Sequence, residues 1–231
     1  MKKLLFFIFI ITGDRTNAQY QVDTNITAAY RKVFQQAPDH IQSLKDTAFR
    51  NGLGLLTNIH TDTLNKEHLK PVDTSLQIFI VNKETGIEEP LASSIDENLS
   101  ITTEHPAWLT CRCRVKGDTL EIAAGRALLS GFGVTAKLTG NSVTARYNEF
   151  TKIAAFRTTK SGKMVDNFDI PATVSNLVLN RKYEKGQQEI FGKLSVTSSG
   201  FFSYLDASAF TQGYQHKRMR LEFYFRCSVL N

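Results

Sequence analysis

From residue 108 onward the chain alternates apolar and polar residues, and short glycine-containing turns separate the alternating runs. Period-two alternation is typical of β-strands with one buried face, and a short turn with glycine joins two such strands as a hairpin. The predicted strands are residues 108–115 and 119–124, 134–139 and 142–150, 153–158 and 163–170, 173–183 and 189–198, and a closing strand at 219–229.

These runs predict an antiparallel meander of about nine strands. A meander of this size must protect its edge strands, so we expect it to form a sandwich or to close as a barrel. The expected fold class is α+β, with an N-terminal amphipathic helical segment packed on this large antiparallel β meander.

The helical segment is expected between residues 24 and 48, where apolar residues recur every three or four positions. Proline is disfavoured inside a helix, so Pro38 predicts two helices that meet near Ala37. The glycines within residues 51–54 predict the end of the helical segment. The apolar stripe comprises Ile26, Tyr30, Val33, Phe34, Ala37, Ile41, Leu44 and Ala48.

The next segment is harder to interpret. Residues 76–81 predict a strand, residues 83–86 a turn, and residues 87–106 a long loop.

The N-terminus has the order of a secretory signal peptide. Lys2 and Lys3 precede an apolar run over residues 4–11, and a polar stretch ends at Ala18. The apolar run is shorter than the roughly 20 residues that a membrane-spanning helix needs, so we expect no transmembrane anchor in the mature chain. Residues 1–18 are therefore predicted to be a signal peptide, and the protein is predicted to be exported to the periplasm, the cell surface or the extracellular space. A buried N-terminal strand of a cytosolic protein is the alternative.

Charge divides the rest of the chain into two segments, which we expect to form one globular unit. Residues 19–105 carry a formal charge of −5, and residues 106–231 carry +9. The charges either average out over a shared surface or leave a basic face on the C-terminal part. Such a face attracts an anionic envelope polymer, a glycan or a partner protein. Export argues against a nucleic-acid ligand.

Three cysteines follow the predicted signal peptide, and alternation directs all three sulfur atoms into the apolar interior. Cys111 and Cys113 share one face of a strand, too far apart to bond to each other. A disulfide of Cys227 with Cys111 or Cys113 is the plausible pairing, and three buried thiols are the alternative. A metal site lacks a fourth soft ligand at suitable spacing.

Residues suited to catalysis are sparse. His60, Asp62, Glu67 and His68 are the densest group, but their spacing does not converge as in His-Glu-x-x-His, and solvated turn residues are the ordinary interpretation. The chain has no Gly-x-Ser-x-Gly elbow and no Gly-x-x-x-x-Gly-Lys phosphate loop. The sequence therefore predicts no catalytic residue, metal site or cofactor, and a hydrolase of envelope polymers is kept as an alternative.

Aromatic and basic residues adjoin near the C-terminus, a combination that suits glycans and anionic surfaces. The leading hypothesis is non-enzymatic binding or a structural role through a basic C-terminal β surface. It requires the cations of this surface to be exposed together; core packing beside a solvated basic turn is the ordinary alternative. A small-molecule carrier with a cavity inside the meander is a further alternative. The candidate binding residues are Arg112, Arg114, Tyr204, Tyr214, Lys217, Arg218 and Arg220.

Overall fold

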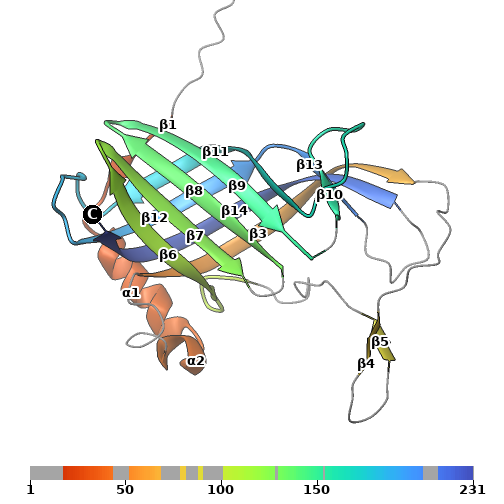
Figure 1. Cartoon of the computed structure of the whole chain (residues 1–231). Coiled ribbons are helices and arrows are strands. Elements are labelled where there is room, and N and C mark those ends of the chain that lie inside the picture. The colour runs from red at the N-terminus through yellow and green to blue at the C-terminus, as the bar shows by residue number, and fades with distance from the viewer. Residues whose placement is uncertain are drawn as a thin grey trace, which may run out of the picture.

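The computed structural model describes residues 18–43, 52–68, 79–81, 88–90, 101–127, 130–152, 154–204 and 213–230. Eight antiparallel strands of this part of the chain form a closed barrel (Figure 1). Each barrel strand pairs with the next one along the chain, and the last strand pairs with the first. The prediction of a mainly antiparallel β architecture is confirmed, and the form that it takes is a barrel.

The barrel strands in chain order are β3 (Gly52–His68), β6 (Ala107–Lys116), β7 (Thr119–Ala127), β8 (Gly131–Thr139), β9 (Ser142–Phe150), β11 (Asn167–Leu179), β12 (Glu189–Ser198) and β14 (Gly213–Leu230). Short strands that extend the same sheet are β1 (Ala18–Gln19), β2 (Gln21–Val22), β10 (Phe156–Arg157) and β13 (Phe201–Tyr204). A separate two-stranded sheet consists of β4 (Phe79–Val81) and β5 (Glu88–Pro90). The helices are α1 (Ile26–Gln36) and α2 (Asp39–Gln42).

The barrel encloses a continuous apolar core. Along β6, Leu109, Cys111 and Cys113 are buried, while the residues between them are exposed. Successive side chains of a strand point to opposite faces, so this alternation places the apolar face inside the barrel and the charged face in solvent. At the end of the barrel near β10 and β13 the core is aromatic. Its buried rings are Tyr147, Phe156, Phe168 and Phe201, with centroids 4.6–6.4 Å apart.

Helix α1 lies against the outside of the barrel, near the end that carries the C-terminus (Figure 1). Its residue Tyr30 is buried and contacts Phe191 of β12 edge to face, with ring centroids 5.5 Å apart. Leu53 and Leu55 of β3 belong to the same cluster. The helix ends before Pro38, as the sequence predicts, and α2 follows it. Two predicted stripe residues, Leu44 and Ala48, lie outside the described residues.

Four sequence predictions are wrong in detail. Residues 52–54 begin strand β3 instead of stopping a helix, and His60 and Asp62 lie in this strand instead of a turn. The predicted strand at 153–158 reduces to Phe156–Arg157, which pairs with β13. Residues 167–179 form one strand that passes through Pro171; it pairs with β9 up to Ala172 and with β12 from Ala172 onward.

Two regions leave predictions open. The predicted signal peptide, residues 1–18, lies outside the described residues except for Ala18, which pairs with β9 as the start of β1. The predicted turn at 83–86 also lies outside them.

No helix in the described part of the chain is long and apolar enough to span a membrane. The strand predicted at 76–81 is described only as β4.

Candidate functional site

The structure divides the candidate binding residues into two groups. Arg112 and Arg114 lie exposed on the outer face of β6. Lys217, Arg218 and Arg220 lie on β14, in the part of that strand that pairs with residues 60–63 of β3. The single surface that the sequence predicts is therefore not formed. The backbones of Tyr204 and Tyr214 pair with each other, and their side chains lie outside the description.

Arg218 and Arg220 are partly neutralised by a carboxylate from the acidic segment. The Nε–H groups of both arginines donate to Oδ2 of Asp62, at 2.6 Å and 2.7 Å. The hydrogen bond from Arg218 is the main reason that the pKa of Asp62 lies below its usual range. Asp62 thus stays ionised and holds both guanidinium groups in place.

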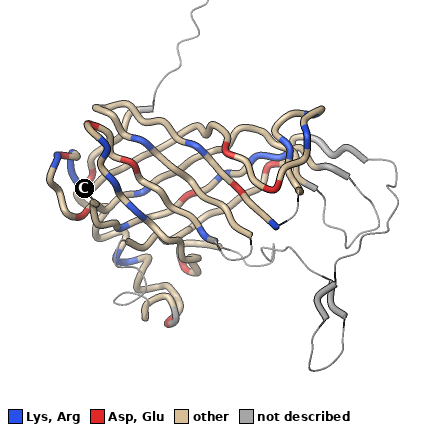
Figure 2. The backbone as a smooth tube through the Cα atoms, viewed as in Figure 1, with Lys and Arg blue, Asp and Glu red and all other residues tan. Residues whose placement is uncertain are grey.

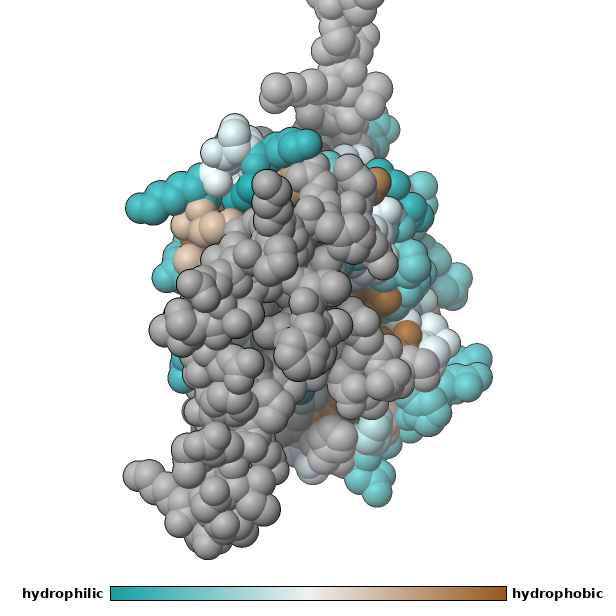
Figure 3. Space-filling view, turned by 90° about the vertical axis from the view of Figure 1, so that its right-hand side faces the viewer, coloured by the Kyte–Doolittle hydropathy of each residue, from teal (hydrophilic) through white to brown (hydrophobic). Residues whose placement is uncertain are grey.

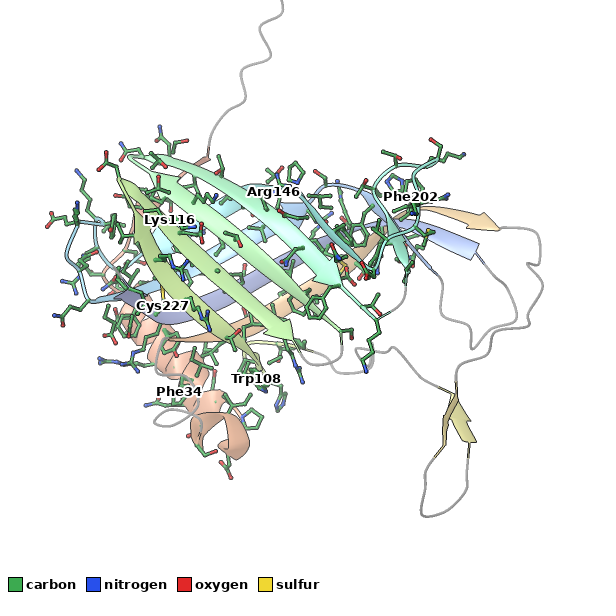
Figure 4. The ribbon with its side chains drawn as sticks, viewed as in Figure 1. Phe34, Trp108, Lys116, Arg146, Phe202 and Cys227 are labelled. Carbon is green, nitrogen blue, oxygen red and sulfur yellow. A yellow bond between two sulfur atoms is a disulfide. The ribbon has the colours of Figure 1, made fainter. Side chains whose placement is uncertain are left out.

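Strands β6 to β9 carry a second group of cations on their outer face, which we call the basic face. Figure 4 shows Lys116 and Arg146 on this wall of the barrel, away from Phe202 at the end formed by β10 and β13. Figure 2 shows blue segments, the Lys and Arg residues, along the same strands. Its members are Arg112, Arg114 and Lys116 of β6, Lys137 of β8 and Arg146 of β9.

Strand register sets the spacing of the cations on this curved wall of the barrel. Arg112, Ala123, Thr135 and Arg146 lie side by side on four adjacent strands. Neighbouring strands are about 4.8 Å apart, so Arg112 and Arg146 are separated by about 14 Å along the curved wall. The residues between them, Ala123 and Thr135, are small. Arg112 and Arg114 are two positions apart on one strand, so they repeat about every 7 Å.

Two carboxylates belong to the basic face and balance part of its charge. Glu121 lies 3.6 Å from Lys116 Nζ and 3.8 Å from Lys137 Nζ. Asp169 accepts a 2.8 Å hydrogen bond from Arg146 Nε. The five cations and two carboxylates leave a formal charge of +3.

A shallow depression of about 400 Å³ lies on the basic face. Its lining combines hydroxyl, amide and charged groups, which can donate to and accept from a polar ligand. Its charged residues are the cations Lys137 and Arg146 and the carboxylates Glu121, Glu149 and Asp169, so the depression itself is not basic. The polar residues Thr135, Asn148 and Asn167 and the rings of Phe150 and Phe168 complete the lining.

A buried carboxylate at the aromatic end of the barrel was missed by the sequence interpretation. Tyr147 donates a 2.9 Å hydrogen bond to Glu149. Burial raises the pKa of Glu149, while Lys217 and the hydrogen bond from Tyr147 oppose that rise. The Lys217 ammonium group also lies 5.3 Å from the ring centroid of Phe201. The sequence does contain a signal for this residue. Side chains of a strand alternate between its two faces, so Glu149, two positions after the inward Tyr147, is expected to point inward as well.

The cysteines lie in the barrel core. Cys113 of β6 is bonded to Cys227 of β14, with Cα atoms 5.7 Å apart, which is one of the two pairings kept open from the sequence. Cys111 is a free, buried thiol, and burial raises its pKa to about 12. A thiol of this kind is protonated and unreactive at neutral pH.

The group of catalytic residue types at 60–68 does not form a metal centre in the described part of the chain. His60 and Asp62 share the outer face of β3, with His60 Nε2 3.2 Å from Asp62 Oδ1. No set of three or more His, Cys, Asp or Glu side chains among the described residues is placed to hold a metal ion. The side chains of Glu67 and His68 lie outside the description.

Comparisons with protein-family models, with curated proteins and with solved structures found no match to this chain. Function is therefore inferred from the charges, contacts and shape of the barrel alone.

Proposed function

We propose that the protein is exported and that it binds an acidic polysaccharide, without catalysis, through the basic face. The basic face is the observation that carries this proposal. Its cations stand on the outer wall of a closed sheet, and a rigid wall holds them in place before any ligand arrives. The formal charge of +3 favours an anionic ligand.

A polymer suits this surface better than a compact ligand does. The cations are spread along about 14 Å of the curved wall, and no single enclosed pocket among the described residues gathers them. A chain with repeated carboxylate or sulfate groups can contact several of these cations at once. The hydroxyl and amide groups of Thr135, Asn148 and Asn167 can pair with sugar hydroxyls.

The barrel interior gives no comparable support to the carrier alternative. The small inward residues that suggested a cavity, Ala136 and Ala145, are buried within one continuous cluster of side chains. Eight-stranded barrels either fill their interior with side chains or hold one small ligand, and the described inward residues here pack as one cluster.

The test measures binding to immobilised heparin and to polygalacturonate, with neutral dextran as the reference surface. Two triple variants are compared: R112A/R114A/K137A removes three cations of the basic face, and R31A/K32A/K163A removes three exposed cations elsewhere. Exposed ion pairs contribute about 0.5–1 kcal/mol each, so the first variant should bind at least about tenfold more weakly.

Binding by the wild type should also weaken as salt increases, because exposed charges are screened. The matched variant R31A/K32A/K163A keeps the basic face and should bind nearly as the wild type does. Equal losses in the two variants, or equal binding to dextran, would refute the proposal. Circular dichroism of each variant checks that the fold is retained.

A further inference from the structure

A separate group of cations is organised around one carboxylate at the far end of β3 and β14. We call it the Asp62 cluster; its members are His60, Asp62, Arg218 and Arg220. On the paired strands Asp62 lies opposite Arg218, and His60 lies opposite Arg220, so the four side chains form a compact block on the outer face. The Asp62 side chain is only 15% exposed, whereas that of Arg220 is 52% exposed. The carboxylate therefore lies beneath the cations.

The contacts with Asp62 use only part of what the two arginines can donate. Each guanidinium group has five N–H donors, and each gives its Nε–H to Asp62 Oδ2. Among the described residues, these are the side-chain hydrogen bonds of Arg218 and Arg220. Within this part of the chain, their terminal N–H groups therefore have no acceptor. Two cations share one carboxylate, which leaves a surplus positive charge.

The surroundings of the Asp62 cluster add further cationic and aromatic groups. His216, the next outward residue of β14, stacks on Phe202 with ring centroids 4.4 Å apart. Arg157 lies over the same ring, 4.8 Å from its centroid. Figure 3 looks onto this end of the barrel, where the described surface around the rim is mainly hydrophilic.

We propose that the Asp62 cluster binds one compact tetrahedral oxyanion, the sulfate or phosphate ester group of a larger ligand. The planar guanidinium fork matches two oxygen atoms of such a group. Asp62 already fixes both forks, so binding costs little further ordering of these side chains. One carboxylate joins the two arginines, whereas the cations of the basic face are dispersed.

The Asp62 cluster is distinct from the basic face. Strand β3 runs from Leu53, opposite Thr110 of β6, to Asp62, a rise of about 30 Å. Arg112 lies on the other side of Thr110, farther still from Asp62. One compact anionic group cannot contact both sites, so each proposal can fail without the other.

The experiment titrates the full chain with methyl sulfate and, in a second arm, with methyl phosphate, at constant ionic strength maintained with chloride. Binding is followed by the NMR signals of the arginine Nε–H groups. We expect saturable shifts of the Arg218 and Arg220 signals in one or both arms. Arg220→Ala should weaken binding about tenfold, as expected for loss of a charge-assisted hydrogen bond. Arg220→Lys keeps the charge and should recover only part of the affinity, because it lacks the fork.

Arg226→Ala is the matched control. Arg226 is on the same strand and also donates Nε–H to a carboxylate, that of Glu189, at 2.6 Å. This variant should bind both esters as the wild type does. The inference is overturned if neither ester gives saturable shifts, or if Arg226→Ala and Arg220→Ala lose affinity equally. Acetate at the same concentration should bind more weakly, and equal binding of acetate would also contradict a tetrahedral oxyanion site.

Discussion

Reduction of the Cys113–Cys227 disulfide is expected to cause a large loss of stability. The two residues are 114 positions apart, so the bond closes a long loop in the unfolded chain. The chain-entropy relation gives about 4.8 kcal/mol of stabilisation for a loop of this length. The total free energy of unfolding of a small domain is about 5–15 kcal/mol. The reduced protein should therefore remain folded, but with little free energy of unfolding left.

The assay is equilibrium unfolding in urea with and without a phosphine reductant, followed by the fluorescence of the single tryptophan, Trp108. The free energy of unfolding should fall by about 4–5 kcal/mol on reduction. The urea dependence should become steeper, because an uncrosslinked unfolded chain exposes more surface. A change below about 1 kcal/mol would refute the entropic reasoning.

Cys111→Ala is the control for this experiment. The variant keeps the Cys113–Cys227 bond, so reduction should destabilise it by the same amount as the wild type. Thiol titration of the unreduced protein should find one reactive sulfhydryl group after denaturation and none in the native state at pH 8. The native result follows because burial raises the pKa of Cys111 to about 12. Three sulfhydryl groups in the denatured, unreduced protein would contradict the disulfide itself.

Three further predictions concern the packing and the charge of the barrel. A Cβ atom at Gly192 would meet the ring of Phe225, so Gly192→Ala should lower the free energy of unfolding by about 1–3 kcal/mol, measured in urea. Thr197→Ala, on the same strand, is the control and should change it by less. Tyr30→Ala should lower the free energy of unfolding by about 3–5 kcal/mol, because it removes the ring that packs between α1 and the barrel. A decrease below about 1 kcal/mol would argue against that packing. The pKa of Glu149 is raised in the folded state, so its stabilising contribution is present in acid and is lost as pH rises through that raised pKa. Glu149→Gln should therefore gain stability relative to the wild type between acid and neutral pH, and a constant difference across that range would contradict the assignment.

The hairpins could be predicted because local chemistry determines them. Gly117, Gly140 and Gly186 have positive φ values, a conformation that a residue with a side chain rarely adopts, and each lies in a predicted turn. The strands around them have one apolar face and one polar face. Alternation and turn chemistry were thus sufficient for β6 to β9 and for β12.

Strand β3 could not be predicted, because its environment differs along its length. Its first residues are covered on both faces, by the barrel core and by α1, so Leu53, Leu55 and Leu56 are all buried and do not alternate with polar residues. Its later residues are polar on the outer face and resemble a turn. Tertiary contacts, not local propensity, make this segment a strand.

The candidate site could be predicted only in part for the same reason. Sequence alternation placed Arg112 and Arg114 outward on one strand, but it could not show which distant cations join them. Register across four strands brings Lys137 and Arg146 to the same face. Pairing of β3 with β14 brings Asp62 to Arg218 and Arg220, although these residues are separated by more than 150 positions.

The pairing of the first barrel strand with the last one also fixes an order of events in time. In a nascent chain β3 is the first barrel strand to be synthesised, but the partner that closes the barrel, β14, is the last of the eight. Until then the hairpins between them can form, yet the barrel keeps two open edges. Loss of even the final strand would leave a sheet that cannot close, and such a sheet is prone to associate with other copies of itself.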